Sequence, residues 1–247
     1  MSSSTSIGSY FYLLGLRVVL ECGNLIEYIR VVSRYYSNKQ FRSVDLALLF
    51  SYLLRSPFAI SKEFLRQRGQ KNLHEYGETP LTVLDEIVQR YGITEKDTVY
   101  ELGCGRGRSC FWLHSFIKCR VVGIDYLPEF IEKAQSIQSK FQLQQVEFRC
   151  ENMFKADLRD ATAIYLYGTT LSDESIFRLL ENLQKLKPGT KVISVTFPLT
   201  EFSVGLFELV DSFPVRYPWG VTDVFLQKKL PAGEIFQDMK DRKRQDE

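Results

Sequence analysis

The segment VYELGCGRG, residues 99–107, decides the fold of this chain. Its first residues favour a strand, an acid follows at Glu101, and three glycines stand at alternate positions before a helix-like run over 109–116. Glycines let the backbone approach a ligand closely, and the start of a helix offers free N–H groups. The segment therefore predicts a strand, a glycine-rich turn and a helix that bind a nucleotide-like ligand.

The glycine spacing departs from the dinucleotide fingerprint. That fingerprint needs glycine at the sixth position of G-x-G-x-x-G, and the sixth position counted from Gly103 is Arg108. The pattern is instead acid-x-G-x-G-x-G from Glu101 to Gly107, which resembles the first motif of the class I S-adenosylmethionine (SAM) methyltransferases. The resemblance implies SAM as the cofactor and methyl transfer as the reaction. An ordinary strand-to-helix turn is the alternative.

Two polar residues follow at the ends of the next two predicted strands. Asp125 ends the strand over 120–124, where a carboxylate can accept hydrogen bonds from both ribose hydroxyls or begin the next helix. Asn152 follows the third strand at a place where SAM enzymes usually have Asp, and its side-chain oxygen can accept from the adenine amino group. Met153 then lies against the adenine face. Both positions favour SAM over an NAD-type ligand.

Strands and helices alternate after residue 97, which implies a parallel sheet covered on both faces. The predicted strands are 98–102, 120–124, 145–149, 162–167 and 191–197, with helices over 107–117, 128–140 and 172–187. Residues 207–215 and 222–228 are strand-like and predict an antiparallel edge hairpin. We expect an α/β fold: a Rossmann-like, seven-stranded, mostly parallel sheet with an antiparallel edge hairpin, preceded by an N-terminal helical extension.

The chain is predicted to have four parts, which are disordered residues 1–8, a helical subdomain over 9–73, the methyltransferase domain over 74–230 and a charged tail over 231–247. Three-to-four spacing of apolar residues indicates helix over 10–36. Ser43 is expected to cap a second helix that runs to residue 54, and a third helix is expected over 61–68. Pro80 is expected to begin a helix over 81–91 that Gly92 ends.

Composition limits the partners of the chain. A formal charge of +2 on 247 residues is too small for nucleic-acid binding by bulk charge, so no nucleic acid is expected. Five scattered cysteines form no C-x-x-C pair and indicate reduced thiols, so we expect a cytoplasmic protein. Two histidines make a zinc site improbable, and no metal is expected. The apolar stretches near the N-terminus carry charges, so these helices are expected to lie buried or on a membrane surface rather than to span one.

Residues 74–80 read HEYGETP. They resemble the Tyr-Gly-Glu-Thr loop of the non-SET protein lysine methyltransferases of the histone telomeric-silencing type, and the mitochondrial relatives of that family resemble this chain as well. The resemblance covers about residues 74–228, and it implies that the loop closes over the methionine part of SAM and that the acceptor is a protein lysine. One departure stands after the fourth strand, where the histone enzyme has paired asparagines and this chain reads YGTT over 167–170.

The expected cofactor contacts combine the glycine turn, the strand ends and this loop. They are Tyr76, Glu78, Thr79, Glu101, Gly103, Cys104, Gly105, Gly107, Asp125, Tyr126, Asn152 and Met153. Glu78 and Glu101 are expected to face the positive methionine end of SAM. Tyr167 and Trp219, with Phe197, are the candidates for an aromatic acceptor channel, and core packing is the alternative for each.

No acid–base dyad stands out in the sequence. His114 falls within a predicted helix, and His74 lies beside the Tyr76 loop. The leading hypothesis is a protein lysine methyltransferase, whose partner is a methyl-acceptor protein. The alternatives are a small-molecule or lipid methyltransferase, with peripheral membrane contact through the N-terminal helices, and a non-catalytic SAM- or partner-binding module.

Overall fold

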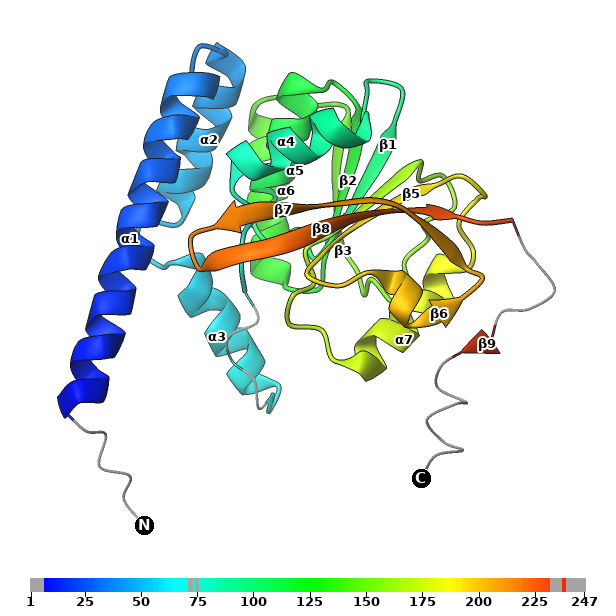
Figure 1. Ribbon diagram of the computed structural model, residues 1–247. Coiled ribbons are helices and arrows are strands. Elements are labelled where there is room, and N and C mark those ends of the chain that lie inside the picture. The colour runs from blue at the N-terminus through cyan, green and yellow to red at the C-terminus, as the bar shows by residue number, and fades with distance from the viewer. Residues whose placement is uncertain (1–6, 71–72, 74–75, 232–236, 239–247) are drawn as a thin grey trace.

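The computed structural model describes residues 7–70, 73, 76–231 and 237–238 of the 247-residue chain (Figure 1). A seven-stranded sheet has the order β3-β2-β1-β4-β5-β8-β7. The strands are β1 (Thr98–Leu102), β2 (Arg120–Asp125), β3 (Val146–Cys150), β4 (Ala163–Leu166), β5 (Lys191–Val195), β7 (Phe207–Tyr217) and β8 (Gly220–Lys229). The first five are parallel, and the β7–β8 hairpin pairs antiparallel with β5. The predicted fold class is confirmed.

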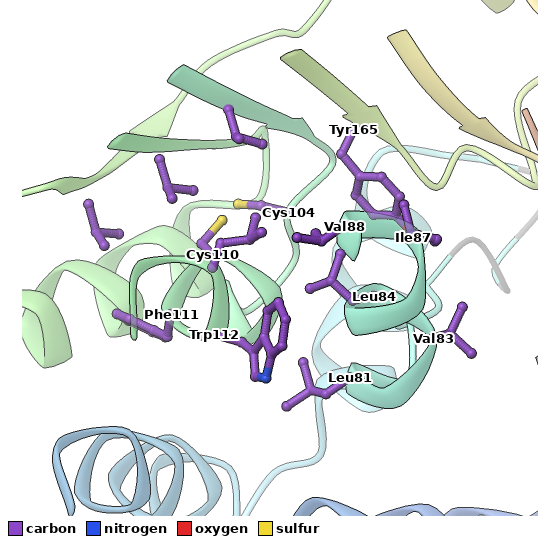
Figure 2. Packing of buried hydrophobic residues seen from close by; sticks show 14 of the residues in the cluster. Leu81, Val83, Leu84, Ile87, Val88, Cys104, Cys110, Phe111, Trp112 and Tyr165 are labelled. Carbon is purple, nitrogen blue, oxygen red and sulfur yellow. The ribbon is translucent and has the colours of Figure 1, made fainter. Parts of the chain in front are cut away.

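Helices cover both faces of the sheet. They are α4 (Leu81–Tyr91), α5 (Arg108–Phe116), α6 (Pro128–Lys140) and α7 (Asp173–Leu183). Successive strand residues point to opposite faces, so Val99 and Val121 belong to one buried cluster with α4, α5 and α6 while Tyr100 and Val122 belong to another with α7. Figure 2 shows the first cluster, in which side chains of α4 and α5 gather beside Tyr165 of β4. All four residues of β4 are buried, as expected of a central parallel strand.

Three helices precede this domain: α1 (Ile7–Tyr35), α2 (Lys39–Ser51) and α3 (Pro57–Gln67). The Tyr35 hydroxyl donates to Asp85 of α4 at 2.8 Å, which fastens the end of α1 to the domain. Figure 1 shows α1 as a long helix beside the domain, reached by the turn of the β7–β8 hairpin. No helix in the described ranges is long and apolar enough to cross a membrane.

The starts of these helices differ from the sequence-based predictions. α1 begins at Ile7, so the last two residues of the predicted disordered segment are helical, while residues 1–6 lie outside the described ranges. Asn38, not Ser43, caps α2, because its side-chain oxygen accepts from the Phe41 amide at 3.1 Å. Ser56 caps α3 with Pro57 as its first residue, so that helix begins earlier than predicted.

Elements with an unambiguous end were predicted closely. α4 covers 81–91 as predicted and ends at Gly92, which is left-handed with φ 60°, although Pro80 is its N-cap rather than its first residue. Within the predicted tail, β9 (Gln237–Asp238) pairs with β6 (Ser203–Val204), which follows a short 3₁₀ helix η1 (Leu199–Glu201). Residues 232–236 and 239–247 lie outside the described ranges.

Candidate cofactor and acceptor site

The glycine turn joins β1 to α5 and keeps its backbone bare. Gly103, Gly105 and Gly107 have φ values of 78°, 53° and 76°, a conformation that favours glycine. A Cβ at Gly107 would lie 2.4 Å from the Phe148 ring, so the close approach of β3 also requires glycine there. The amides of Gly103 and Cys104 both donate to the Ile124 carbonyl of β2, at 2.8 and 3.0 Å, which fixes the turn against the neighbouring strand end.

Asp125 ends β2 and holds the glycine turn. Its carboxylate accepts from the Gly105 amide at 2.8 Å and from the Leu127 amide at 2.9 Å. Burial raises the pKa of this carboxyl, although those amides lower it. A carboxylate has lone pairs beyond the two used here, so Asp125 can also accept from the hydroxyls of a ribose placed over the turn.

Glu101 is a buried acid beside a small cavity. The Ser109 hydroxyl lies 2.6 Å from both carboxylate oxygens, and the Cys110 thiol donates at 3.0 Å. Burial raises the pKa of Glu101 to about 7, although these hydrogen bonds lower it. Within the described residues no cation is paired with this acid. An unpaired buried carboxylate suits an ammonium group, so the site fits the methionine end of SAM.

The cavity brings together residues from three predicted sets. It has a volume of about 20 Å³, and its lining includes Glu78 and Thr79 of the loop, Glu101, Gly103 and Cys104 of the glycine segment, and Tyr167. Arg106 and Arg108 line it as well, each paired with an acid. This volume is room for about a single water molecule.

The Tyr76 loop lies directly on the glycine turn. The Tyr76 ring is 2.9 Å from where a Cβ of Gly105 would stand, and its hydroxyl donates to Glu78. Arg106 donates to the same carboxylate at 2.7 Å. Burial raises the pKa of Glu78, but the Arg106 guanidinium outweighs it, and the net pKa is lowered. In this structure Arg106 neutralises Glu78 and clamps the loop, and the expectation that Glu78 faces the positive end of SAM stays a prediction.

Four aromatic residues, which we call the aromatic cluster, adjoin this loop: Tyr165, Tyr167, Tyr217 and Trp219. The Trp219 indole donates to the Tyr167 hydroxyl at 3.2 Å, and Trp219 stacks on Tyr217 with ring centroids 5.2 Å apart. The Tyr165 hydroxyl lies 2.5 Å from Thr79 Oγ1. Tyr217 is buried and Trp219 is 50% exposed, so the cluster runs from the core to the surface.

Two of the four residues of this cluster were predicted from the sequence. Tyr167 and Trp219 were predicted and do lie together, whereas Tyr165 and Tyr217 were missed. Alternation along β4 could have paired Tyr165 with Tyr167 on one face. Phe197 does not belong to the aromatic cluster. Its ring centroid lies 5.8 Å from that of Phe202, and both rings pack against the buried cluster on the α7 face of the sheet.

The predicted adenine end lies at the ends of β2 and β3, whose residues Asp125 and Cys150 are paired in register. The Asn152 side-chain oxygen accepts from the Phe154 amide at 2.9 Å, which leaves its second lone pair for another donor. Met153 is partly buried against the α7 core, and Tyr126 is 42% exposed with its ring 5.3 Å from Phe64 of α3. The roles of these three residues stay predictions. His74 lies outside the described residues.

Arg108, which breaks the dinucleotide fingerprint, has a structural partner that the sequence did not suggest. Its guanidinium makes two hydrogen bonds to Asp45 of α2, at 2.7 and 2.8 Å, and the Tyr36 hydroxyl donates to the same acid at 2.9 Å. Asp45 is 1% exposed. The first residue of α5 thus anchors the N-terminal helices beside the glycine turn.

The chain is similar to several methyltransferases. The family described as "ANTKMT methyltransferase domain" matches residues 101–204. The chain is 24% identical over 202 residues to a histone-lysine N-methyltransferase, H3 lysine-79 specific, of Dictyostelium discoideum, a match that covers 75% of this chain and 10% of that protein. It is 29% identical over 126 residues to a protein-lysine N-methyltransferase of Saccharolobus islandicus, covering 50% of this chain and 77% of that one. The chain therefore spans about a tenth of the first relative's length.

Solved structures share the fold. An RNA methyltransferase from Salinibacter ruber in complex with S-adenosyl-L-homocysteine is 28% identical, with a TM-score of 0.54 over 66% of this chain and 100% of that chain. TrmN from Thermus thermophilus is 18% identical, with a TM-score of 0.54 over 62% of this chain and 50% of that chain, which shows the fold alone. The predicted Rossmann-like methyltransferase fold and the SAM cofactor are confirmed.

Proposed function

We propose that this chain, which belongs to the class I SAM-dependent methyltransferases, transfers methyl groups to a lysine side chain of a protein. The observation that carries the proposal is the aromatic cluster. It stands at the end of β4, where Tyr167 also lines the cavity that holds Glu101, and it reaches the surface at half-exposed Trp219. An aromatic passage from solvent to the cofactor suits a long side chain that ends in an amine.

For methyl transfer from SAM, the protein has to align the acceptor with the methyl group and exclude water. Bound SAM supplies a methyl group on a sulfonium, which is already an electrophile. The aromatic cluster would orient the incoming amine and exclude water. Apolar surroundings disfavour an ammonium and so lower the pKa of a lysine that enters them. The lysine then gives up its proton to solvent, and its lone pair would form the N–C bond as the C–S bond breaks and S-adenosylhomocysteine leaves. A positioned base is then unnecessary, since the amine reaches the site neutral.

In this proposal the remaining predicted residues hold the cofactor. Asp125 takes the ribose, Asn152 and Met153 the adenine, and Glu101 the ammonium, with the bare backbone of Gly103 to Gly107 beneath. The cavity of about 20 Å³ has no room for a methionine chain. Residues 76–79 therefore have to move outward when SAM binds, which breaks or lengthens the contact between Glu78 and Arg106.

The names of the two curated relatives support lysine as the acceptor, since each is a lysine methyltransferase. The solved relative from Salinibacter ruber is an RNA methyltransferase. A test of the proposal therefore has to follow protein, RNA and lipid together.

The test is transfer of label from SAM into a cell lysate. We expect label in protein that is recovered as methylated lysine after hydrolysis. Trp219→Ala should lower transfer by roughly 10²-fold, because a misplaced acceptor loses most of the gain from alignment, while SAM binding is kept. The control Leu209→Ala, which truncates another half-exposed apolar side chain, should transfer label like the wild type.

Label that enters only RNA, lipid or small metabolites would contradict the proposal. Equal transfer by the Trp219→Ala and Leu209→Ala proteins would contradict it as well.

Peripheral membrane contact is a second proposal, and the corner between α2 and α3 supports it. Phe50, Leu53, Leu54 and Phe58 are 67%, 69%, 103% and 63% exposed. Phe50 lies at the end of α2 and Phe58 at the start of α3, and Leu53 and Leu54 lie in the segment between the two helices. Exposed apolar side chains gathered in one short segment favour binding at a lipid interface. We name these four residues the apolar corner.

Flotation with anionic phospholipid vesicles tests the apolar corner. The wild type should float, and Leu53→Glu/Leu54→Glu should remain in the dense fraction because two buried charges are costly in the interface. Val221→Glu, on exposed β8 surface, is the control and should float. Equal behaviour of the two variants would refute membrane contact at this corner.

A further inference from the structure

A cleft of about 460 Å³ separates α1 from the β7–β8 turn and from the start of α4. Val18, Val19, Cys22 and Ile26 of α1 form one wall, and Pro80, Tyr217 and Pro218 form the other. The two walls approach each other at Gly23, where an added Cβ would stand 3.5 Å from Pro218. Figure 1 shows the hairpin turn reaching α1. We call this hollow the α1 cleft.

The α1 cleft is continuous with the aromatic cluster. Tyr217 lines the cleft, stacks on Trp219 and lies with its ring 5.6 Å from that of Tyr167. Tyr167 in turn lines the cavity that holds Glu101 and Gly103. Two aromatic rings, those of Tyr217 and Tyr167, thus lie between the cleft and the cavity beside Glu101. A lysine on a segment in the cleft would meet the aromatic cluster at half-exposed Trp219, which stacks on Tyr217.

One end of the α1 cleft is positively charged. Arg30 and Arg216 line it, and neither has an ion-pair partner in the described part of the chain. Glu27 also lines it, but its carboxylate accepts from the Thr82 amide and hydroxyl at 3.1 and 2.7 Å and so caps α4. Arg30 and Arg216 also line an adjoining hollow of about 270 Å³, together with Arg34 and one acid, Glu86, so arginines outnumber acids there.

We propose that the α1 cleft binds the segment of the acceptor protein that carries the target lysine, and that this segment combines apolar residues for the α1 wall with acidic residues for Arg30 and Arg216. The inference rests on the proposed lysine methylation and adds the recognition of the substrate to it. A lipid surface is flat and cannot enter a concave cleft, whereas an extended or helical peptide can. The charge of the cleft selects acidic residues by complementarity.

The probes are four pools of fluorescently labelled peptides, each with a central lysine. Their flanks are apolar and acidic, apolar and basic, polar and acidic, or polar and basic. Fluorescence anisotropy measures binding to the full-length protein with SAM present, and labelled SAM measures methylation of the lysine. We expect the apolar and acidic pool to bind roughly tenfold or more tightly than the others and to be methylated preferentially.

Variants locate the effect. Ile26→Glu places a carboxylate in the cleft wall and should weaken binding of that pool roughly tenfold. Ile29→Glu is the matched control, since Ile29 is an exposed α1 residue outside the lining (58% against 50% for Ile26), and this variant should bind the pool as the wild type does. Arg30→Glu/Arg216→Glu should reverse the preference to the apolar and basic pool. Thermal unfolding of each variant verifies the fold.

The outcomes separate the two proposals. Preferential binding without lysine methylation would support the cleft as a docking site and refute lysine as the acceptor. Lysine methylation with equal use of all four pools, or without reversal in the double arginine variant, would overturn the cleft proposal alone. Unchanged peptide binding by Ile26→Glu would also overturn the cleft proposal. Equal losses of vesicle binding or of self-association in Ile26→Glu and Ile29→Glu would then assign this face of α1 to a membrane or to a second copy of the chain.

Discussion

Glu101 is buried against Ser109 and Cys110, and burial raises its pKa from 4.5 to about 7. The neutral acid cannot pair with an ammonium, so SAM affinity should rise as the pH rises through about 7, with release of a proton on binding. The free energy of unfolding changes in the opposite direction. Glu101 ionises at a lower pH in the unfolded chain than in the folded protein, so its contribution to stability is lost as the pH rises from 4.5 to about 7. Calorimetry at several pH values, in buffers of different ionisation enthalpy, measures both the affinity for SAM and the number of protons released on binding.

Glu101→Gln is the control for that prediction, since it keeps the shape of the side chain and removes its titration. Its SAM affinity should be weaker and independent of pH in the same range. A wild-type affinity that does not change across neutral pH would show that Glu101 does not contact the cofactor's charge.

Single residues also mark where sequence reasoning succeeded. The places of Glu101, Asp125 and the glycines follow from one segment and the two strands beside it, because their spacing is local. The partner of Glu78 could not be predicted in this way. Arg106 and Arg108 stand in the turn, but their acids are 28 and 63 residues away in sequence, so only the folded chain decides that Arg106 pairs with Glu78 and Arg108 with Asp45.

At the scale of elements, the pair of Arg108 and Asp45 joins α2 to α5. Asp45→Ala leaves the buried Arg108 guanidinium uncompensated and should destabilise the protein by about 3–5 kcal/mol. Asp45→Ala/Arg108→Met removes both charges and should recover most of that loss. Urea unfolding measures the free energies. Arg55→Ala, which breaks the exposed pair with Glu129, is the control and should cost about 0–1 kcal/mol.

Equal destabilisation by the single and double variants would mean that α2 is held by packing and not by this ion pair. The result bears on the site, since Arg108 begins the helix that follows the glycine turn.

Helix starts show why element boundaries are only partly predictable. α4 and α6 were placed to the residue because Gly92 and Pro128 permit one reading each. Before α2 two capping residues compete, and tertiary contact decides between them. Asn38 caps the helix while its amide lies 3.4 Å from the Ser115 carbonyl of α5, a contact that no local pattern contains.

At the scale of the whole molecule, the parallel sheet and its edge hairpin followed from alternation and strand composition, whereas the order of the strands came from the structure. The acceptor side did not, because it is built by contacts between residues far apart in the chain. Trp219 meets Tyr167, Glu27 of α1 caps α4 at Thr82, and Tyr217 joins the α1 cleft to the aromatic cluster. The N-terminal helices therefore belong to the proposed site and are not an appendage beside it.

Calorimetric titration of the full-length protein with SAM tests the account most directly. We predict one SAM per chain for the wild type and for Gly15→Arg, whose new side chain meets open space on α1. Asp125→Ala should weaken binding by about 1–3 kcal/mol. Gly105→Arg should abolish it, since the position has a φ of 53° and the Tyr76 ring lies against it. Undiminished binding by Gly105→Arg, or no binding by the wild type, would contradict the proposed site.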